Sequence, residues 1–574
     1  MNARETYDSW LNSPYFSDET KAELLSIKDD AHEIEERFYK ELEFGTAGLR
    51  GIIGAGTNRM NIYTVRKATQ GLANYIIKCD ACSKGVAISY DSRHMSPEFA
   101  DEAALCLAAN GIKAYVFTSL RPTPELSFAV RYYGCTAGIN ITASHNPSDY
   151  NGYKVYWEDG AQITPPHDGG IMEEVRTIKD YADVKTMSKE DAINKGLYIP
   201  VDKEADEAYY AAVKGCILSP EAIAEFAKEL KVVYTPLHGT GLVPVTEILS
   251  GLGFENVYVV PEQREPDGDF PTVAYPNPEA DEAFALAVEL AKKVDADLIL
   301  ATDPDADRLG VRIKTGKGEY LDLNGNVSGC LIGYYELKRR KELNILPEDG
   351  ELITSIVSSK MSRAIAEKYG IRFAEVLTGF KWIGREMLRM EEEKCGTYLF
   401  GFEESYGCLI GTYARDKDAV AASMALCEAA AYAKSKGKTL YDDLKEIYET
   451  VGYYREDVKS ITMSGIEGLA EIAAIMKKLR NTEVKEIGSF KVLKVRDYAS
   501  GMITDMADGT KTPTGLPGSD VLYYELENDG WVAVRPSGTE PKIKLYFGIK
   551  GKTAEEADAI AGRMKTSVSA LAEL

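Results

Sequence analysis

The sequence predicts an α/β protein with four domains. At 574 residues the chain is too long for one hydrophobic core, since single cores stop growing at about 250–300 residues. A short β-branched run that ends in a polar or glycine-rich loop recurs along the chain, and an amphipathic stretch follows it. Strands that alternate with helical segments are typical of βαβ units.

Lapses in this periodicity mark the predicted domain boundaries. The first forty residues carry scattered apolar positions among many charges, which is typical of a surface helical region. The last part of the chain has a different pattern, with strand-like segments such as SFKVLKVRDY. We therefore expect domains at residues 1–204, 205–322, 323–455 and 456–574, each of the first three with one loop of unusual residues after a strand.

Composition excludes several kinds of partner. The net charge of −23 argues against nucleic acid, which needs a basic face, but leaves room for small anionic ligands held by local donors. The N-terminus lacks the apolar segment of a signal peptide, and no apolar run approaches the ~18 residues of a membrane span. Only Cys79 and Cys82 of the nine cysteines form a CxxC pair. We expect a cytoplasmic protein with reduced, mostly buried thiols.

The first unusual loop lies in ITASHNPSDYNGYKVYW, residues 141–157. It places the hydroxyl of Ser144 on a turn between two predicted strands. The glycines of a hydrolase nucleophile elbow are absent around it. His145 is adjacent, and neighbours in an extended segment point to opposite faces, so His145 is not expected to be well placed as a base for Ser144.

Other nucleotide and phosphate motifs are missing from the chain. GIIGAGTNR lacks the third glycine of a dinucleotide-binding loop, and no GxxxxGK[ST] is present. The function must therefore depend on other loops.

The second unusual loop, DPDADR, follows the apolar run ADLILAT. Asp303, Asp305 and Asp307 alternate and share one face of an extended segment. Successive pairs in a straight strand would be about 6.6 Å apart, so a single ion requires a bend, with which Pro304 is compatible. The EF-hand pattern fails, because Arg308 stands where it needs glycine. A few hard oxygen ligands suit Mg²⁺; a solvated acidic turn is the alternative.

The third and fourth loops carry groups that suit a sugar and a phosphate. GFEESYG places Glu403 and Ser405 in a glycine-bounded loop after a strand, with carboxylates able to accept hydrogen bonds from sugar hydroxyls. RPSGTEP can form an anion cradle from an arginine, hydroxyls and glycine N–H groups. Charged surface loops or a plain hairpin turn are the alternatives. The residues of these loops and their neighbours are Thr378, Gly379, Lys381, Glu403, Glu404, Ser405, Arg415, Lys417, Arg535, Ser537, Gly538, Thr539, Lys542 and Lys544.

Together, TASHNP, DPDADR, GFEES and RPSGTEP resemble the motifs of the α-D-phosphohexomutase family, in the family's order, and the resemblance runs from GTAGLRG near residue 45 to KIKLYF near 546. GFEES resembles the sugar loop of the phosphoglucomutase branch. The resemblance implies four domains around a central cleft, three of them related α/β domains and the fourth a smaller C-terminal α+β domain.

The resemblance also implies roles for individual residues. Ser144 would be the phosphoserine, and its phosphate would join the three aspartates in holding Mg²⁺. Glucose 1,6-bisphosphate would be the activator and the reaction intermediate. The implied catalytic residues are Arg50, Ser144, His145, Lys154 and Lys417, with Lys417 the candidate general acid/base. The implied metal ligands are Ser144, Asp303, Asp305 and Asp307. The implied substrate-binding residues are Thr46, Arg308, Thr378, Gly379, Glu403, Ser405, Arg535, Ser537, Gly538 and Thr539.

The expected reaction is the interconversion of glucose 1-phosphate and glucose 6-phosphate. The sequence leaves open a phosphopentomutase, a phosphomannomutase or a glucose 1,6-bisphosphate synthase, because the same loops would serve all of them. A metal-dependent phosphatase and a non-catalytic Ca²⁺- or carbohydrate-binding protein are alternatives from other classes. The oligomeric state is not predicted.

Overall fold

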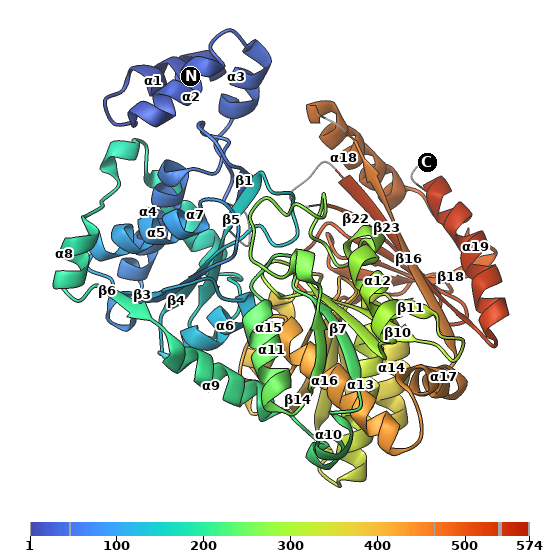
Figure 1. The fold of residues 1–574 in the computed structure, drawn as a ribbon. Helices are drawn as coiled ribbons and strands as arrows, with labels where there is room; N and C mark the ends of the chain where they lie inside the picture. Colours follow the sequence, from blue (N-terminus) through green and yellow to red (C-terminus); the bar gives the residue numbers. More distant parts are fainter. Residues whose placement is uncertain (1, 45–47, 464, 538–541, 572–574) are drawn as a thin grey trace. The chain divides into compact units, whose positions relative to one another are not determined.

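The computed structural model of the chain describes residues 2–44, 48–463, 465–537 and 542–571. These residues form two compact units, each with its own hydrophobic cores. The first unit comprises Met1–Asp322, Gly384–Lys394 and Tyr406–Ser435, and the second comprises Leu323–Ile383, Cys395–Ser405 and Lys436–Leu574. Figure 1 shows the helices and strands of both.

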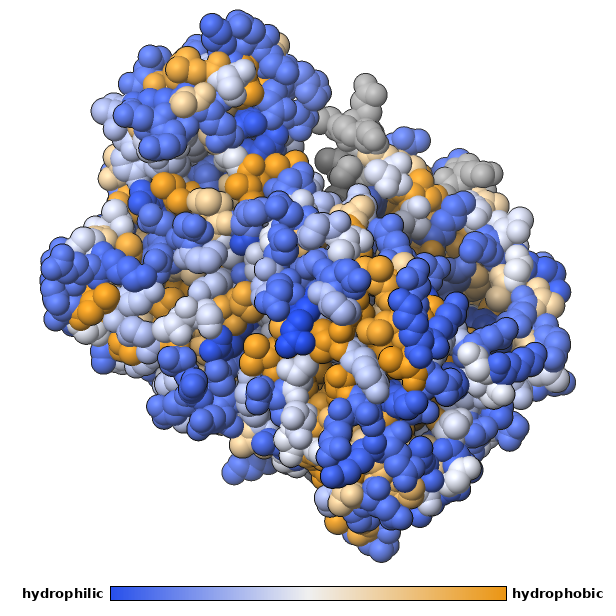
Figure 2. Space-filling view, in the orientation of Figure 1, coloured by the Kyte–Doolittle hydropathy of each residue, from blue (hydrophilic) through white to orange (hydrophobic). Residues whose placement is uncertain are grey.

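Three short helices begin the first unit, as the charge pattern of the first forty residues predicts. They are α1 (Ala3–Asn12), α2 (Asp18–Ser26) and α3 (Ala31–Phe38). Their buried faces share an aromatic core in which Trp10 stacks on Phe16, with ring centroids 4.1 Å apart. Most residues that these helices present in Figure 2 are hydrophilic. Arg37 ties this layer to the chain beyond β1 through the Ala55 carbonyl, 3.2 Å away.

The first sheet has the order β1-β5-β4-β2-β3-β6, with β2, β3, β4 and β6 parallel and β1 and β5 antiparallel to their neighbours. Its strands are β1 (Gly48–Ile52), β2 (Val86–Tyr90), β3 (Ala114–Phe117), β4 (Ala137–Ile141), β5 (Tyr150–Trp157) and β6 (Tyr198–Val201). The helices that accompany them are α4 (Ile62–Lys78), α5 (Ser96–Ala109), α6 (Thr123–Tyr132), α7 (His167–Thr177) and α8 (Lys189–Asn194).

Both faces of this sheet are buried, because successive residues of a strand point to opposite sides. Val86 and Ile88 of β2 pack in the core shared with α4 and α5, whereas Ala87 lies in the core shared with α6. The polar loops at the carboxyl ends of the parallel strands are therefore carried by a rigid three-layer frame.

The second sheet has the order β11-β10-β9-β7-β8. Its strands are β7 (Lys231–Thr235), β8 (Asn256–Val259), β9 (Leu298–Thr302), β10 (Leu309–Lys314) and β11 (Tyr320–Leu323). The helices around it are α9 (Lys203–Lys214), α10 (Pro220–Phe226), α11 (Leu242–Gly251), α12 (Ala285–Val294) and α16 (Ala419–Ser435). Every residue of β9 is buried, which explains its uninterrupted apolar run.

The second unit contains a parallel sheet and an antiparallel one. The parallel strands are β13 (Arg372–Val376), β12 (Gly350–Ser355) and β14 (Thr397–Glu403), in that order. The helices of this unit beside the parallel strands are α13 (Gly325–Glu342), α14 (Met361–Tyr369) and α17 (Leu440–Val451). Two further elements of the same stretch of sequence, α15 (Lys381–Glu393) and β15 (Gly407–Ile410), fall mostly or entirely in segments of the first unit.

The antiparallel sheet has the order β16-β23-β22-β21-β18-β19-β20, and β17 pairs with β18. Its elements are β16 (Tyr453–Thr462), α18 (Gly465–Asn481), β17 (Glu486–Ile487), β18 (Phe490–Asp497), β19 (Met502–Asp505), β20 (Lys511–Pro513), β21 (Leu522–Leu526), β22 (Trp531–Pro536), β23 (Lys542–Gly551) and α19 (Ala554–Leu571). This change from parallel to antiparallel pairing accounts for the different pattern of the last part of the sequence.

Two expectations from composition can be compared with the structure. All nine cysteines are free thiols, and five of them are buried. Within the described ranges, none of the helices combines the length and the apolar character needed to span a bilayer.

Candidate functional site

Ser144 lies in the loop between β4 and β5, as the sequence predicts, and it is 3% exposed. Its backbone has a φ of 53°, a left-handed conformation that non-glycine residues seldom adopt. The Ser144 N–H donates to the Thr142 hydroxyl (2.8 Å), which in turn donates to the Asp91 carboxylate (2.6 Å). The Ser144 hydroxyl donates to Oδ2 of Asp303 at 2.9 Å. The loop thus presents one oxygen to the aspartate cluster.

A buried guanidinium holds this loop in place. Arg93 is 1% exposed, and its Nη atoms donate to the backbone carbonyls of Ser144 (2.6 Å), Asn146 (2.5 Å), Pro147 (2.6 Å) and Tyr150 (3.0 Å). Asp91 compensates its charge, with Nε and Oδ2 3.3 Å apart. Both residues follow β2 in the segment YDSR, so the frame of the sheet positions the loop directly.

The expectation about His145 is wrong. Its Nδ1 lies 3.2 Å from the Ser144 hydroxyl oxygen. The expectation assumed an extended backbone, in which neighbours diverge, but the left-handed turn at Ser144 brings the two side chains to the same side. Burial and the nearby Arg308 and Arg50 guanidinium groups hold the pKa of His145 well below its usual value, so the ring is a neutral acceptor or donor at this position.

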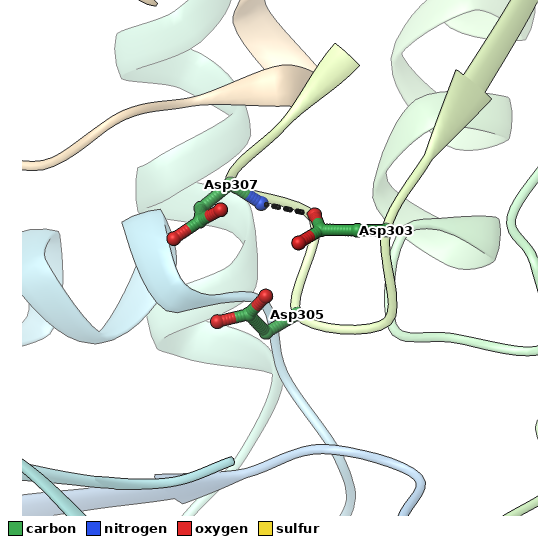
Figure 3. Close-up of side chains that lie close together, drawn as sticks. All are labelled: Asp303, Asp305 and Asp307. Carbon is green, nitrogen blue, oxygen red and sulfur yellow. Dashed lines mark hydrogen bonds between the residues drawn. The ribbon is translucent and has the colours of Figure 1, made fainter. Parts of the chain in front are cut away.

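The three aspartates follow β9 and their carboxylates point toward one another (Figure 3). One oxygen from each of Asp303, Asp305 and Asp307 lies within 4.8 Å of the others, and all three residues are buried. The predicted bend is confirmed. Ala306 has a φ of 50°, and Oδ1 of Asp303 accepts the N–H groups of Asp307 (3.1 Å) and Arg308 (3.0 Å), which closes the turn.

Two oxygens of this cluster suit a cation. Oδ1 of Asp305 and Oδ1 of Asp307 are buried and have no hydrogen-bond partner within the described part of the chain. A buried carboxylate oxygen left unpaired is costly unless a cation or donor satisfies it. Hard, mostly charged oxygen atoms in a small cluster fit Mg²⁺, which binds few protein ligands and completes its shell with phosphate or water oxygens.

Two lysines flank the aspartates. Lys154 Nζ lies 2.6 Å from Oδ2 of Asp305 and 3.4 Å from Oδ2 of Asp307, and Lys417 Nζ lies 3.2 Å from the latter atom. Burial alone would raise the pKa of Asp307, but the Lys417 and Lys154 ammonium groups hold it below its usual value. Burial raises the pKa of Asp303 well above its usual value, and the charges of its two aspartate neighbours add to the effect.

Lys417 is held by a second carboxylate. Its Nζ donates to Oδ1 of Asp416 at 3.0 Å, and the Tyr156 hydroxyl donates to the other oxygen of Asp416 at 2.8 Å. Tyr156 lies on β5, two residues after Lys154. One strand therefore carries Lys154 and, through Tyr156 and Asp416, helps to position Lys417.

Two predicted arginines lie at the edge of this cluster. Arg50, on β1, is exposed and donates to Oδ1 of Asn146 in the Ser144 loop (3.2 Å). Arg308 donates to Glu279 at 2.6 Å, and its Nε lies 3.9 Å from Oδ1 of Asp307. The structure thus brings Ser144, His145, Lys154, Lys417, Arg50 and Arg308 together with the three aspartates in the first unit.

In the second unit, the end of β14 meets the loop that follows β13. Oε1 of Glu403 accepts the Gly379 N–H at 2.7 Å, and Gly379 has a φ of 113° that favours glycine. The buried Thr378 hydroxyl has no hydrogen-bond partner among the described residues, while Ser405 is partly exposed. The adjacent Glu404 accepts the Ser355 hydroxyl at 2.9 Å. The structure therefore joins the GFEES and LTGF loops.

Strands β22 and β23, which the RPSGTEP segment connects, pair antiparallel, so this loop lies between two strands as the sequence predicts. Arg535 pairs in register with Lys544, and the Ser537 N–H donates to the Lys542 carbonyl at 2.7 Å. Gly538 and Thr539 lie outside the described residues, as does Thr46 of GTAGLR.

Sequence reasoning missed Asp91, Arg93, Thr123 and Asp416. These residues hold the predicted site residues in position through hydrogen bonds and ion pairs. Thr123, the first residue of α6, donates its hydroxyl to Oδ2 of Asp305 at 2.7 Å. Asp91 and Arg93 could have been identified from the sequence, because YDSR follows an apolar strand just as DPDADR does. Thr123 had no such signal beyond the proline that follows it.

Comparison with protein families covers most of the chain. Models of the phosphoglucomutase/phosphomannomutase family match in four consecutive segments: alpha/beta/alpha domain I at residues 41–182, domain II at 207–316, domain III at 324–451 and the C-terminal domain at 469–567. The fold class predicted from sequence, three α/β domains followed by a distinct C-terminal domain, is confirmed.

Relatives match over nearly their whole length. The phosphoglucomutase of Staphylococcus epidermidis is 38% identical over 554 residues, which are 96% of this chain and 98% of the relative. That of Staphylococcus aureus is 40% identical over 522 residues, covering 90% and 92% of the two chains.

Solved structures share the fold. A putative phosphomannomutase from Thermus thermophilus superposes with a TM-score of 0.68 at 21% identity, covering 92% of this chain and 99% of the other. The open form of parafusin, a phosphoglucomutase from Paramecium, gives a TM-score of 0.68 at 18% identity, covering 93% and 96%. The four family segments and the relatives matched over nearly their full length show that the chain belongs to the phosphoglucomutase/phosphomannomutase family.

Proposed function

We propose that this chain is a phosphoglucomutase that interconverts glucose 1-phosphate and glucose 6-phosphate through a phosphoserine at residue 144. Relatives of 38–40% identity that bear this name support the activity. The observation that carries the proposal is the placement of one buried serine hydroxyl 2.9 Å from a carboxylate of the aspartate cluster. Phosphoryl transfer depends mainly on positioning and charge stabilisation, which this arrangement supplies.

Mg²⁺ is the metal that the cluster would hold, through Asp303, Asp305 and Asp307 together with an oxygen of the Ser144 phosphate. When bound, it would offset the phosphate charge, which otherwise repels an incoming sugar phosphate. Lys154 and Lys417 would add positive charge on the same side, and Arg308 would exchange its contact with Glu279 for the phosphate.

The steps follow from this arrangement. A free hydroxyl of the bound sugar phosphate attacks the phosphorus of phosphoserine 144, and the bond from phosphorus to Ser144 Oγ breaks. The Lys417 ammonium group gives a proton to the leaving Oγ, and the amine so formed takes the proton of the attacking hydroxyl. The product, glucose 1,6-bisphosphate, turns end for end. Ser144 Oγ then attacks the other phosphate and the bond from that phosphorus to the sugar oxygen breaks. His145 or Lys417 passes the serine proton to the sugar oxygen, and the isomeric monophosphate leaves. Glucose 1,6-bisphosphate would also be the activator that restores the phosphoserine.

The second unit would bind the rest of the substrate. Glu403 and Ser405, with Thr378 and Gly379 beside them, would accept and donate hydrogen bonds to sugar hydroxyls. Arg535, Ser537, Gly538 and Thr539 would hold the phosphate that is not reacting, with Thr46 and Arg50 near the reacting one. Domains at residues 1–204, 205–322, 323–455 and 456–574, and a cytoplasmic location, belong to the same proposal.

Intact mass and peptide mapping test the central claim. The protein is incubated with ³²P-labelled glucose 6-phosphate, and the peptide of residues 136–154 is isolated. We expect about one phosphate per chain on Ser144, exchangeable with substrate, and loss of both label and mutase activity in Ser144→Ala. Full activity without phosphate on that peptide would overturn the proposal, and inorganic phosphate as the main product would indicate a phosphatase instead.

Substrate choice is tested with glucose 1-phosphate, mannose 1-phosphate and ribose 1-phosphate in the same assay. We expect the highest kcat/KM with glucose 1-phosphate. A preference for mannose or ribose 1-phosphate would keep the phosphoserine mechanism and change the substrate.

A further inference from the structure

Thr123 directs both of its hydrogen-bond donors, the hydroxyl and the backbone N–H, at one residue of the aspartate cluster. It is fully buried at the first position of α6. Its hydroxyl donates to Oδ2 of Asp305 at 2.7 Å, and its backbone N–H donates to the Asp305 carbonyl at 2.8 Å. Asp305 lies 182 positions away in the sequence, so the contact joins the first sheet's helices to the loop after β9.

The hydroxyl proton of Thr123 has a defined direction. A carboxylate only accepts hydrogen bonds, so the Thr123 O–H must point at Asp305. Its oxygen accepts Nδ2 of Asn140 at 2.6 Å, and Oδ1 of Asn140 accepts the Ser89 hydroxyl at 3.0 Å. Ser89, Asn140 and Thr123 are all fully buried. In this series of hydrogen bonds, from Ser89 through Asn140 and Thr123 to Asp305, every donor points toward Asp305, and each hydrogen bond strengthens the next.

This contact decides which oxygen of Asp305 is available. Oδ2 is occupied by Thr123 and by Lys154, 2.6 Å away. Oδ1 is buried and has no partner within the described part of the chain. With two donors on Oδ2, the carboxylate cannot rotate freely, and Oδ1 is the oxygen left for a cation.

We propose that Thr123 is a positioning residue that orients Asp305 for the cation and thereby raises the protein's affinity for it. The inference rests on the proposed metal site. Groups that hold a metal ligand by a hydrogen bond typically contribute about 10–100-fold to metal affinity. Thr123→Val keeps the shape of the side chain and removes the donor, so Oδ2 of Asp305 is left to Lys154 alone.

Mn²⁺ is the probe, because it takes the same oxygen ligands as Mg²⁺ and free Mn²⁺ is read directly by electron paramagnetic resonance. We expect the Mn²⁺ dissociation constant of Thr123→Val to rise about 10–100-fold over that of the unaltered protein. Thr123→Ser, which keeps the hydroxyl, should bind Mn²⁺ within about twofold of it. This rescue separates positioning from a general loss of structure.

Thr69→Val is the matched control. Thr69 is equally buried in the same unit, and its hydroxyl bonds the Val65 carbonyl and Tyr153, away from the aspartates. The Mn²⁺ affinity of Thr69→Val should equal that of the unaltered protein.

If Thr123→Val does not fold, Asn140→Ala is the deciding variant. It leaves the Thr123 hydroxyl in place but removes the Asn140 amide that orients this hydroxyl. We expect a smaller, measurable loss of Mn²⁺ affinity.

The outcomes separate the inference from the proposed function. Unchanged Mn²⁺ affinity in Thr123→Val, or in Asn140→Ala where that variant decides, overturns the role of Thr123 and leaves the metal site standing. No saturable Mn²⁺ binding by the unaltered protein, with or without phosphate on Ser144, overturns the metal site and this inference together.

Discussion

Buried charges in the first unit set the residue-level properties of the site. Arg93 and Asp91 form an ion pair with both side chains at 0% exposure, and Arg93 also holds four carbonyls of the Ser144 loop. Such a pair contributes little as an isolated attraction. Its effect here is geometric, because four oxygens of one loop are fixed to one planar group.

Arg93→Ala should lower the free energy of unfolding by about 3–5 kcal/mol, since it leaves the Asp91 charge buried and uncompensated. Phosphoryl transfer to Ser144 should also slow, because the loop loses its anchor. Urea denaturation measures the first effect and labelling of Ser144 the second. The control Arg264→Ala removes a surface arginine paired with the exposed Glu265 and should stay within about 0.5 kcal/mol. Equal stability of the two variants would contradict the prediction.

A second buried charge gives a pH dependence. Glu125 is fully buried, and neither carboxylate oxygen has a hydrogen-bond partner within the described ranges. Burial, and then the neighbouring Asp206, raise its pKa well above its usual value, although Arg121 lies 3.6 Å away. The folded protein therefore retains a proton that the unfolded chain has released above about pH 4.3, so stability falls as pH rises from that value.

Glu125→Gln should abolish this component of the pH dependence. One proton contributes a slope of up to about 1.4 kcal/mol per pH unit. The variant should therefore match the unaltered protein near pH 4 and exceed it in stability at pH 8, as measured by denaturation across that range. Glu262→Gln, at an exposed position, is the control. Parallel pH profiles for the Glu125 variant and the unaltered protein would refute the assignment.

At the level of elements, the loops after β7 and β9 are packed backbone to backbone. Gly239 lies so close to Pro304 that a Cβ added to it would be 2.4 Å from the Pro304 Cα, and the Thr240 N–H donates to the Pro304 carbonyl at 2.8 Å. The segment LHGTG therefore packs directly against the aspartate turn, and the close backbone contact requires glycine at position 239.

Gly239→Ala should displace the aspartate turn, because two backbones cannot both keep their positions around the added methyl group. Misplacement of about 1 Å near a reacting group can cost about 100-fold in rate, and we expect a loss of that order in kcat/KM together with weaker Mn²⁺ binding. In the control, Gly251→Ala, the added Cβ would meet no atom within 4 Å, so neither quantity should change. Normal kinetics for Gly239→Ala would exclude the packing argument.

Elements also show what the sequence could and could not predict. The strand before Ser144 and the strand before Asp303 were predictable, because both are mostly apolar with β-branched or leucine residues and both are followed by polar residues. The left-handed turn at Ser144 was not, since no glycine or asparagine marks it. The contacts of Arg93 with the Ser144 loop and of Thr123 with Asp305 join distant segments, and local periodicity carries no information about such pairs.

At the level of the whole molecule, the described residues fall into two units with separate cores. The sequence predicted four domains from lapses in periodicity, and four family segments match. It could not predict that stretches 384–394 and 406–435 associate with the first unit. For the second stretch this assignment depends on the packing of α16 against α10, α11, β9 and β10, which are distant in the sequence.

Separate cores predict separate unfolding. The chain has four tryptophans: Trp10 and Trp157 belong to the first unit, and Trp382 and Trp531 to the second. Two double Trp→Phe variants, each keeping one pair, should give non-coincident fluorescence transitions in urea, since multidomain chains seldom unfold in one step. Superimposable transitions with a single midpoint would mean that the two units unfold cooperatively.

The φ of 53° at Ser144 has a consequence for how this protein tolerates change. Glycine and asparagine adopt this left-handed conformation at a lower energetic cost than serine does. Thermal stability therefore favours replacement of Ser144, whereas catalysis requires it. A library selected only for survival at high temperature should enrich Ser144→Gly or Ser144→Asn, and the enriched clones would be more stable proteins without a hydroxyl to carry the phosphoryl group.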